Sequence, residues 1–465
     1  MNTGQSKVKF ARGRRRFLKG SLGELHFQAL TYFLDAFRRI LPHTQIGAWE
    51  KDLNPATPGA RWTGSSRREL RIRLLLRGTG IEDIALTTTL KRRVVLPLRE
   101  IPRTLDTREQ DICNCIVKVL HEFWNRVTDN STEHVVEALV RAFDQAAISK
   151  HIVARHQFSP AELFSSLRKL SERSYEGKSI PLGILVETNR YVKRKAKTGS
   201  LEDYLNDKKY HVLTDGYDTA YLLDLEGEIS EIVDLDRLSK KESDRGRRFY
   251  PEWSRRMALS CRGTRIGFSL TRQGDILYFD DGNLRITYRA GRWQYWNHVH
   301  VLDILLHATP AQRVLPRKRA RILRQVYKRA LDLSFRRTGG LCILLRSRGW
   351  LHNIVRRGDA IGDRKRRKLD EALDMFLRNQ SILRVPPHVL VDLASVDGAV
   401  VFANSGQLLA YGAVLDPKRK GSRILQGQGS RTKAAIAASH YGLATKVSSD
   451  GDISFYSKGK ELLSI

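Results

Sequence analysis

The sequence predicts an α/β protein in which a C-terminal mixed β-sheet is flanked by helices and preceded by an α+β region. Three observations carry this prediction. Runs rich in apolar and β-branched residues, typical of buried strands, occur in both halves of the chain. Segments with apolar residues at helical spacing separate these runs, as in a sheet covered by helices on both faces. The chain of 465 residues is longer than a single domain with one hydrophobic core usually is, so several domains are expected.

Shifts in composition divide the chain into four expected regions. Residues 1–20 form a basic arm, 21–155 an N-terminal α+β region, 156–308 a sensor domain and 309–465 a C-terminal α/β domain. The arm is polar and basic, which fits either a phosphate-contacting arm or a solvated tail. In the next region, helical periodicity and β-branched runs predict a helix at 21–41, strands within 71–98, and helices at 108–127 and 132–153.

The expected sensor domain opens with a helix start signal. Ser159 is the expected N-cap, with Pro160 at the first helical position. Strand-like runs follow, and between residues 265 and 296 such runs alternate with short turns, as in a β-meander. In its last run Trp293 and Tyr295 share one face. A place in the core is the preferred interpretation of this pair, and base stacking is the alternative.

The C-terminal region opens with a basic helix. Pro316 is expected at its start, and Gly339 and Gly340 end it before a buried strand at 341–345. A helix is expected at 369–377, and the two prolines at 386–387 prevent its continuation. Residues 389–393 are expected to lead into a turn at Asp397. Strand-like runs around one small-residue helix complete the unit.

Charge is the unusual quantity of this chain. Lys and Arg total 82 against 50 acidic residues, a formal charge of +32 with a pI near 10.2. Such an excess favours polyanions, and the basic clusters at 313–324 and 364–368 are candidate contacts for nucleic acid. A basic surface without a dedicated partner is the alternative. No apolar run reaches the length of a membrane span, so no membrane partner is expected.

The number and spacing of the cysteines indicate the redox state of the cellular compartment in which the protein is expected. Cys113, Cys115, Cys261 and Cys342 are few and lack the spacing of a zinc site, and the N-terminus has no hydrophobic signal core. We expect buried thiols in a reducing compartment and therefore a cytoplasmic protein.

Three turns near the C-terminus carry the candidate site residues. Asp397 and Asp450 each precede a glycine, and their carboxylates are candidate ligands for Mg²⁺ or Mn²⁺ or for a hydroxyl. Arg431 and Lys433 stand at the expected start of a helix, where backbone amides favour anions, and form a candidate phosphate cradle. Cations there oppose the helix dipole and so suit a bound anion. The alternative is that Asp397 and Asp450 occupy ordinary turns between strands.

The order of these motifs resembles the diadenylate cyclase (DAC) domain, of the type at the N-terminus of DisA, over about residues 313–465. Asp397 opens the Asp-Gly-Ala signature, and residues 429–435 resemble the Gly-Ser/Thr-Arg-His-Arg-Ala-Ala signature. The resemblance implies condensation of two ATP into cyclic di-AMP by a homodimer or higher oligomer that works face to face. It gives metal and hydroxyl to Asp397, a second metal contact to Asp450, and the triphosphate to Arg431 and Lys433. The substrate-binding residues it implies are Gly398, Ala399, Gly412, Gly429, Ser430, Thr432 and Ser439.

Three departures from the family pattern leave a second interpretation open. Thr432 replaces the histidine of the signature and Lys433 its second arginine. In the last turn, Ser449 and Asp450 replace two glutamates. Lysine is a point charge without the bidentate fork of arginine, so phosphate binding is retained with looser geometry. The alternative to a diadenylate cyclase is therefore a nucleotide-binding sensor with weakened or no turnover.

The preceding region resembles the DACNV-type sensor modules fused to DAC domains in bacterial nucleotide second-messenger and defence systems. The motif SERSYEGK, which begins at Ser171, and the GDILYF and GRWQYW runs after Gly274 carry this likeness. It implies that a sensor domain controls the nucleotidyltransferase.

Overall fold

The chain folds into two compact units. Unit 1 comprises Met1–Glu242 and Ser260–Trp296, and unit 2 comprises Ser243–Leu259 and Asn297–Ile465. Unit 2 thus begins at Asn297 rather than at the expected boundary of 309 and also takes in Ser243–Leu259, and unit 1 joins region 21–155 to the rest of the expected sensor domain. The basic arm and most of the helix expected at 21–41 lie outside the described residues. The computed structural model describes residues 32–33, 35–36, 39–40, 68–75, 81–88, 95–96, 107–124, 126, 133–175, 178–189, 201–210, 213–240, 248–309, 314–356, 358–363, 368–415 and 429–465.

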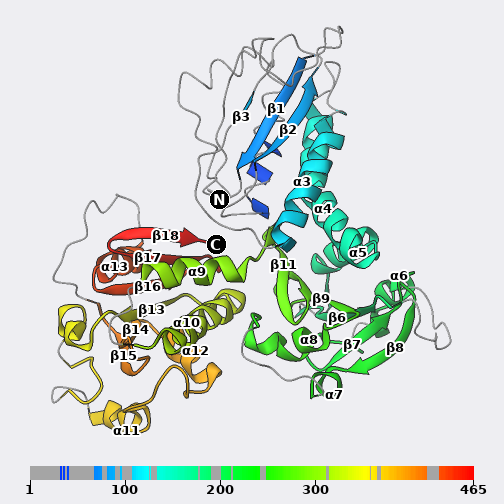
Figure 1. Ribbon diagram of the computed structural model, residues 1–465. Helices are drawn as coiled ribbons and strands as arrows, with labels where there is room; N and C mark the ends of the chain where they lie inside the picture. Colours follow the sequence, from blue (N-terminus) through cyan, green and yellow to red (C-terminus); the bar gives the residue numbers. More distant parts are fainter. Residues whose placement is uncertain are drawn as a thin grey trace. The chain divides into compact units, whose positions relative to one another are not determined.

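Both units are mixed α/β structures, in which mixed β-sheets are flanked by helices (Figure 1). Unit 1 contains a seven-stranded sheet of order β12-β11-β10-β9-β6-β7-β8, antiparallel except for the pair β6–β7. Its strands are β6 (Leu182–Glu187), β7 (Thr219–Leu223), β8 (Ile229–Asp234), β9 (Arg265–Leu270), β10 (Ile276–Asp280), β11 (Asn283–Arg289) and β12 (Arg292–Tyr295). Its longer helices are α3 (Thr107–Trp124), α4 (Glu133–His156) and α5 (Ala161–Ser171).

Smaller elements complete unit 1. A three-stranded sheet has the order β2-β1-β3, and β4 pairs with β5. These elements are β1 (Arg68–Leu75), β2 (Ile81–Thr88), β3 (Val95–Leu96), β4 (Ser174–Tyr175), β5 (Lys178–Ser179), α6 (Leu201–Asn206), η1 (Lys208–Tyr210) and α7 (Leu235–Lys240).

The meander predicted for residues 265–296 is present as β9 to β12. Trp293 and Tyr295 are both buried, which confirms the core interpretation of this pair. Phe164 of α5 packs against the sheet, with its ring centroid 4.4 Å from that of Trp293. Pro160, rather than Ser159, is the N-cap of α5. Among the cysteines, Cys115 and Cys261 are buried free thiols, as expected, and Cys342 is partly exposed.

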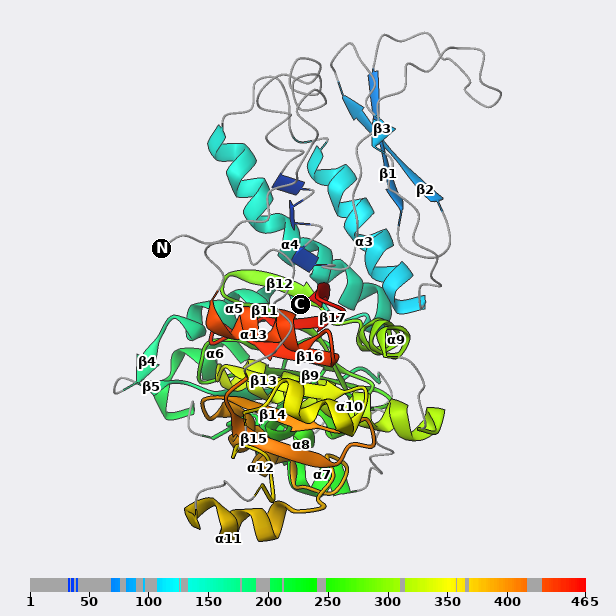
Figure 2. The same ribbon diagram turned by 90° about the vertical axis from the view of Figure 1, so that its left-hand side faces the viewer.

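Unit 2 is built on a six-stranded sheet of order β15-β14-β13-β16-β17-β18. Figure 2 shows β15, β14, β13 and β16 one above the other. The strands are β13 (Gly340–Leu345), β14 (Ala399–Phe402), β15 (Leu408–Ala413), β16 (Gly442–Val447), β17 (Ile453–Ser457) and β18 (Lys460–Ser464). The helices are η2 (Glu252–Ser254), α8 (Arg255–Ser260, which continues into unit 1), α9 (His298–Ala308), α10 (Pro316–Arg336), η3 (Arg348–Asn353), α11 (Lys368–Leu377), α12 (Pro387–Ser395) and α13 (Ser430–Ala438).

Helices cover both faces of the unit 2 sheet. Successive side chains of a strand point to opposite faces. On one face, Cys342 and Val400 lie beside Leu333 of α10 and Ala394 of α12. On the other, residues such as Ile343 join the alanines of α13 in one core cluster. Small side chains on α13 let this helix lie close to the strands.

Several helices of unit 2 were not predicted, among them α12 and α9. Residues 387–395 form α12, where the sequence suggested a direct path into the Asp397 turn, because Pro387 ends the preceding stretch and also occupies the first turn of a new helix. Asn297 caps α9 by accepting a hydrogen bond from the backbone N–H of His300 at 3.0 Å. Within the described ranges, no helix has the length and apolar character required to cross a membrane.

Candidate functional site

The three candidate turns meet one edge of the unit 2 sheet. Parallel pairing of Cys342 with Val400 places the starts of β13 and β14 at the same edge. Antiparallel pairing of Gly340 with Val447 brings the end of β16 there as well. The Asp397 turn precedes β14, and the Asp450 turn follows β16. The register of the sheet therefore brings two turns to one edge, although they are far apart in sequence.

Arg431 joins the helical turn to the Asp397 turn. Its guanidinium donates a hydrogen bond to Oδ1 of Asp397 at 3.2 Å, across 34 residues of sequence. The Asp397 side chain is fully exposed, and that of Arg431 is partly exposed. An exposed ion pair stabilises a fold only weakly, because water competes for both charges. Both groups therefore remain accessible to a ligand.

Glycines make this approach possible. A Cβ on Gly339 would collide with the Arg431 guanidinium, so the cation lies directly over the backbone that opens β13. Gly398 has φ +113°, and a Cβ there would come within 2.6 Å of the carbonyl oxygen of Gly412, whose own φ is +57°. The Asp397 turn thus lies directly against β15. Gly398 and Gly412 shape the turn, and Ala399 is buried beneath it.

The start of α13 offers backbone donors beside Arg431. Gly429 is the N-cap, has an extended backbone and provides no side-chain cap, and the first turn contains no acidic residue. Helix N-termini carry N–H groups without intrahelical partners and a partial positive charge. Ser430 and Lys433 are exposed there, and Thr432 is half-buried. The arrangement suits an anion.

The Asp450 turn is held by its own hydrogen bonds and by α10. The backbone N–H of Gly451 donates to the carbonyl of Ser448 at 3.0 Å. The hydroxyl of Ser334, a buried residue of α10, donates to the carbonyl of Gly451 at 2.5 Å. Asp450 itself is exposed. Between the described side chains, no hydrogen bond or ion pair joins Asp450 to Asp397 or Arg431.

The described side chains at this edge do not form a complete metal site by themselves. In the described parts of the chain, no group of three or more His, Cys, Asp or Glu side chains could hold a metal alone. Mg²⁺ is usually bound by one or two carboxylates together with substrate phosphates and water. The carboxylates of Asp397 and Asp450 are both exposed, so each is open to an ion whose other ligands are water or phosphate.

Ser439 has a different environment from the one expected of a substrate contact. It is completely buried, and its hydroxyl donates to the carbonyl of Ile436 at 2.7 Å. The same hydroxyl accepts a hydrogen bond from the backbone N–H of Gly459 at 2.9 Å. Ser439 thus fixes the end of α13 to the turn between β17 and β18, and its side chain leaves no surface for a ligand.

Sequence reasoning missed the roles of Gly339 and Ser334. The two glycines at 339–340 were interpreted only as a helix stop, yet Gly339 also leaves room for a guanidinium. Nothing local marks Ser334, because its partner Gly451 is 117 residues away. Of the basic clusters, residues 313 and 364–367 lie outside the described residues.

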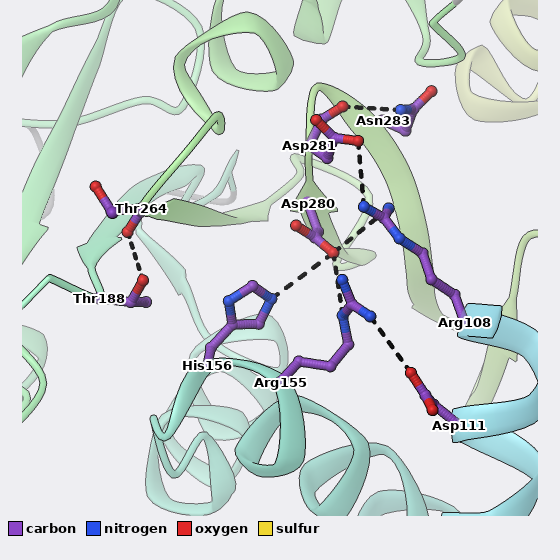
Figure 3. A network of polar contacts seen from close by, with 9 residues as sticks. All are labelled: Arg108, Asp111, Arg155, His156, Thr188, Thr264, Asp280, Asp281 and Asn283. Atoms are coloured by element: carbon purple, nitrogen blue, oxygen red, sulfur yellow. Dashed lines mark hydrogen bonds and ion pairs between the residues drawn. The ribbon is translucent and has the colours of Figure 1, made fainter.

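Unit 1 contains a second charged cluster, around Asp280 (Figure 3). Its Oδ2 lies 3.6 Å from Arg108, 3.5 Å from Arg155 and 3.7 Å from His156. Burial favours a raised pKa for Asp280, but the contact with His156 and the charges of Arg108 and Arg155 hold this pKa well below its usual value. Arg108 also contacts Asp281 at 3.1 Å. These contacts tie α3 and α4 to the β10–β11 turn.

Comparisons with known proteins do not identify a family for this chain. No family model matches the chain, and no curated protein matches it. Similar solved structures include a hypothetical membrane spanning protein from Bacillus cereus, with TM-score 0.22 and 22% identity, over 29% of this chain and 59% of that one. Another is a double mutant of DacA from Staphylococcus aureus, with TM-score 0.24 and 19% identity, over 31% of this chain and 87% of that one. Scores this low support no statement about fold or function.

Proposed function

We propose that unit 2 is a diadenylate cyclase-like nucleotidyltransferase that condenses two ATP into cyclic di-AMP and is controlled by the preceding sensor region. The observation that carries this proposal is the contact between Arg431 and Asp397. It brings the Asp-Gly-Ala turn and the Gly-Ser-Arg-Thr-Lys turn together at one sheet edge, where an exposed carboxylate and a cation lie 3.2 Å apart.

Each group has a role that its chemistry suits. Arg431 and Lys433, with the N–H groups at the start of α13, bind the triphosphate and stabilise charge that develops on it. Asp397 orients the attacking 3′-hydroxyl, and Asp397 and Asp450 would hold Mg²⁺ or Mn²⁺. The ion, when bound, neutralises phosphate charge. On binding, the triphosphate competes with Asp397 for Arg431. Two such sites must face one another to join two nucleotides, so the proposal includes a homodimer or higher oligomer.

A single substitution at Asp397 tests the proposal. The full-length protein is incubated with ATP and Mn²⁺ or Mg²⁺, and products are separated by chromatography. We expect a cyclic dinucleotide from the wild type and a loss of at least about 100-fold in Asp397→Asn, because the amide cannot bind the metal as a carboxylate does. Parallel reactions with other nucleotides identify the preferred substrate.

The matched control is Asp392→Asn. Asp392 also forms an exposed ion pair with an arginine, Arg336, at 2.9 Å, but it lies on α12. This variant should retain full activity. If the wild type forms no product but binds ATP, and Arg431→Ala weakens that binding, the chain is a nucleotide-binding sensor. Absence of both product and ATP binding would sink both interpretations.

A further inference from the structure

A short stretch of chain connects the two units in an unusual way. The chain leaves unit 1 at Glu242, contributes Ser243–Leu259 to unit 2, and returns to unit 1 at Ser260. We call its described part, residues 248–259, the connecting segment. It is joined covalently to unit 1 at both ends and yet packs within unit 2. Any force on this segment from unit 1 therefore reaches unit 2 through the backbone.

Aromatic contacts hold the connecting segment to α9 and α10. Phe249 stacks on His298, with ring centroids 4.9 Å apart and planes 20° apart, and its centroid lies 5.5 Å from that of Tyr327. Nδ1 of His298 and the hydroxyl of Tyr327 form a hydrogen bond of 2.8 Å. Nζ of Lys328 lies 4.9 Å from the ring centroid of Tyr250. Phe249 and Tyr250 are buried, so the segment is part of the core of unit 2.

A buried carboxylate adds a directional contact. Asp332 of α10 accepts a hydrogen bond of 2.5 Å from the backbone N–H of Glu252, at the first residue of η2. Arg329 lies 3.3 Å from Asp332 and 3.6 Å from Glu252. Burial raises the pKa of Asp332 to about 6, against the opposing charge of Arg329. Loss of a partner from a buried carboxylate is costly, so Asp332 and the segment hold each other in place.

The same helix holds the candidate site two residues further on. Ser334 donates its hydrogen bond to the carbonyl of Gly451, next to Asp450. Residues at i and i+2 point to different sides of a helix. One turn of α10 therefore contacts the connecting segment through Asp332 and the Asp450 turn through Ser334, on different sides of the helix.

We propose that α10 links the connecting segment to the candidate site, so that docking of the segment at Asp332 sets the position of the Asp450 turn through Ser334. Ser334 is in this sense a positioning residue for Asp450. Displacement of the segment shifts or loosens this turn of α10 and weakens the hydrogen bond to Gly451. The effect on turnover rests on the proposed function, whereas the mechanical link is measured without nucleotide.

The experiment uses amide hydrogen exchange of the full-length protein. Glu252→Pro removes the N–H that Asp332 accepts, and the extended backbone of Pro251 (φ −60°, ψ 136°) tolerates a following proline. Glu252→Ala removes the same side chain but keeps the N–H. We expect exchange of the amides of Gly451 and Asp452 to rise about fivefold in Glu252→Pro, as for the loss of one hydrogen bond, and not in Glu252→Ala.

Amides elsewhere in unit 2 and two further variants serve as controls. They distinguish the proposed link through α10 from a general destabilisation of the unit. The amides of Lys458 and Gly459, which are bonded to Ser439, should exchange at the wild-type rate in both variants. Ser334→Ala should reproduce the rise at Gly451, and combining it with Glu252→Pro should add little. Ser457→Ala, which removes a buried hydroxyl 3.5 Å from the carbonyl of Ala308, should leave Gly451 unchanged.

Two outcomes of the exchange experiment would contradict the proposed link between the connecting segment and the Asp450 turn. Equal exchange at Gly451 in Glu252→Pro and Glu252→Ala shows that the segment does not hold the turn. A strictly additive effect of Ser334→Ala and Glu252→Pro shows that they act independently. Where ATP is turned over, Glu252→Pro should lower kcat about fivefold and leave the KM for ATP unchanged. A wild type without turnover but with the exchange pattern above contradicts the proposed function alone.

Discussion

Gly398 is the residue on which the geometry of the candidate site most depends. Its φ of +113° is a backbone conformation that side chains rarely adopt, and Gly412 lies directly opposite. Together they let the Asp397 turn lie against β15, within reach of Arg431. Strained or left-handed backbone is retained where the surrounding structure requires it, and it often marks a functional position.

Gly398→Ala should therefore destabilise unit 2 and disrupt the site. The new methyl group would overlap the backbone of Gly412 in addition to the strain at positive φ. We expect a loss of about 3 kcal/mol or more in the free energy of unfolding, measured by urea denaturation followed by circular dichroism.

Gly349→Ala is the matched control for this substitution. A Cβ on this exposed glycine would lie 3.9 Å from its nearest neighbour, the hydroxyl oxygen of Ser347. The change in the free energy of unfolding should stay within about 0.5 kcal/mol. A Gly398→Ala variant as stable as this control would show that the Asp397 turn is not held against β15.

At the scale of elements, local signals predicted the mixed α/β class and several of its helices and strands. Pro316 marked the start of α10, and the apolar run after Gly340 marked β13, because helix starts and buried strands are encoded by neighbouring residues. The strand-like runs separated by short turns between residues 265 and 296 predicted the meander for the same reason. In the C-terminal region, Pro387 was misinterpreted, since one proline both ends a stretch and begins α12.

The candidate site could be predicted only in part. Asp397, Arg431 and Asp450 were identified by type and order, but their spatial relation depends on the register of β13 with β14 and β16. The contact from Ser334 to Gly451 is a tertiary one that no spacing encodes. The expected substrate role of Ser439 came from the family resemblance alone, and its burial depends on a tertiary contact with Gly459.

The first turn of α13 allows a test by gain of function. Thr432→His with Lys433→Arg gives this turn the diadenylate cyclase signature that it resembles, at a helix start where the cations already oppose the dipole. Arginine binds phosphate through a fork of two donors, whereas lysine provides a point charge. We expect the double variant to form cyclic dinucleotide about three- to tenfold faster than the wild type, by chromatography of timed reactions.

Lys460→Arg is the control, because Lys460 is an exposed residue at the start of β18. It should leave the rate unchanged. If the double variant is slower than the wild type, Thr432 and Lys433 are adapted to another ligand, and the resemblance at this turn does not extend to chemistry.

At the scale of the whole molecule, charge and chain path both bear on the proposed function. A formal charge of +32 favours the approach of polyanions, the class to which the proposed substrate ATP belongs. Under the proposed function, specificity then depends on the few residues at the sheet edge of unit 2. That unit is not a continuous segment of the chain, since Ser243–Leu259 packs within it from ahead of Asn297. Boundaries placed by composition alone miss this contribution.

The connecting segment should be required for unit 2 to fold. Burial of large apolar side chains contributes about 1.5–3 kcal/mol each, and Phe249, Tyr250 and Met257 are all buried. Their sum of about 5–9 kcal/mol approaches the entire stability of a typical domain. A fragment of residues 297–465 should therefore show no cooperative thermal unfolding by circular dichroism, and addition of a peptide of residues 243–259 should restore it. A peptide with Phe249→Ser and Tyr250→Ser should not. Cooperative unfolding of the fragment alone would show that unit 2 needs no residues from before Asn297.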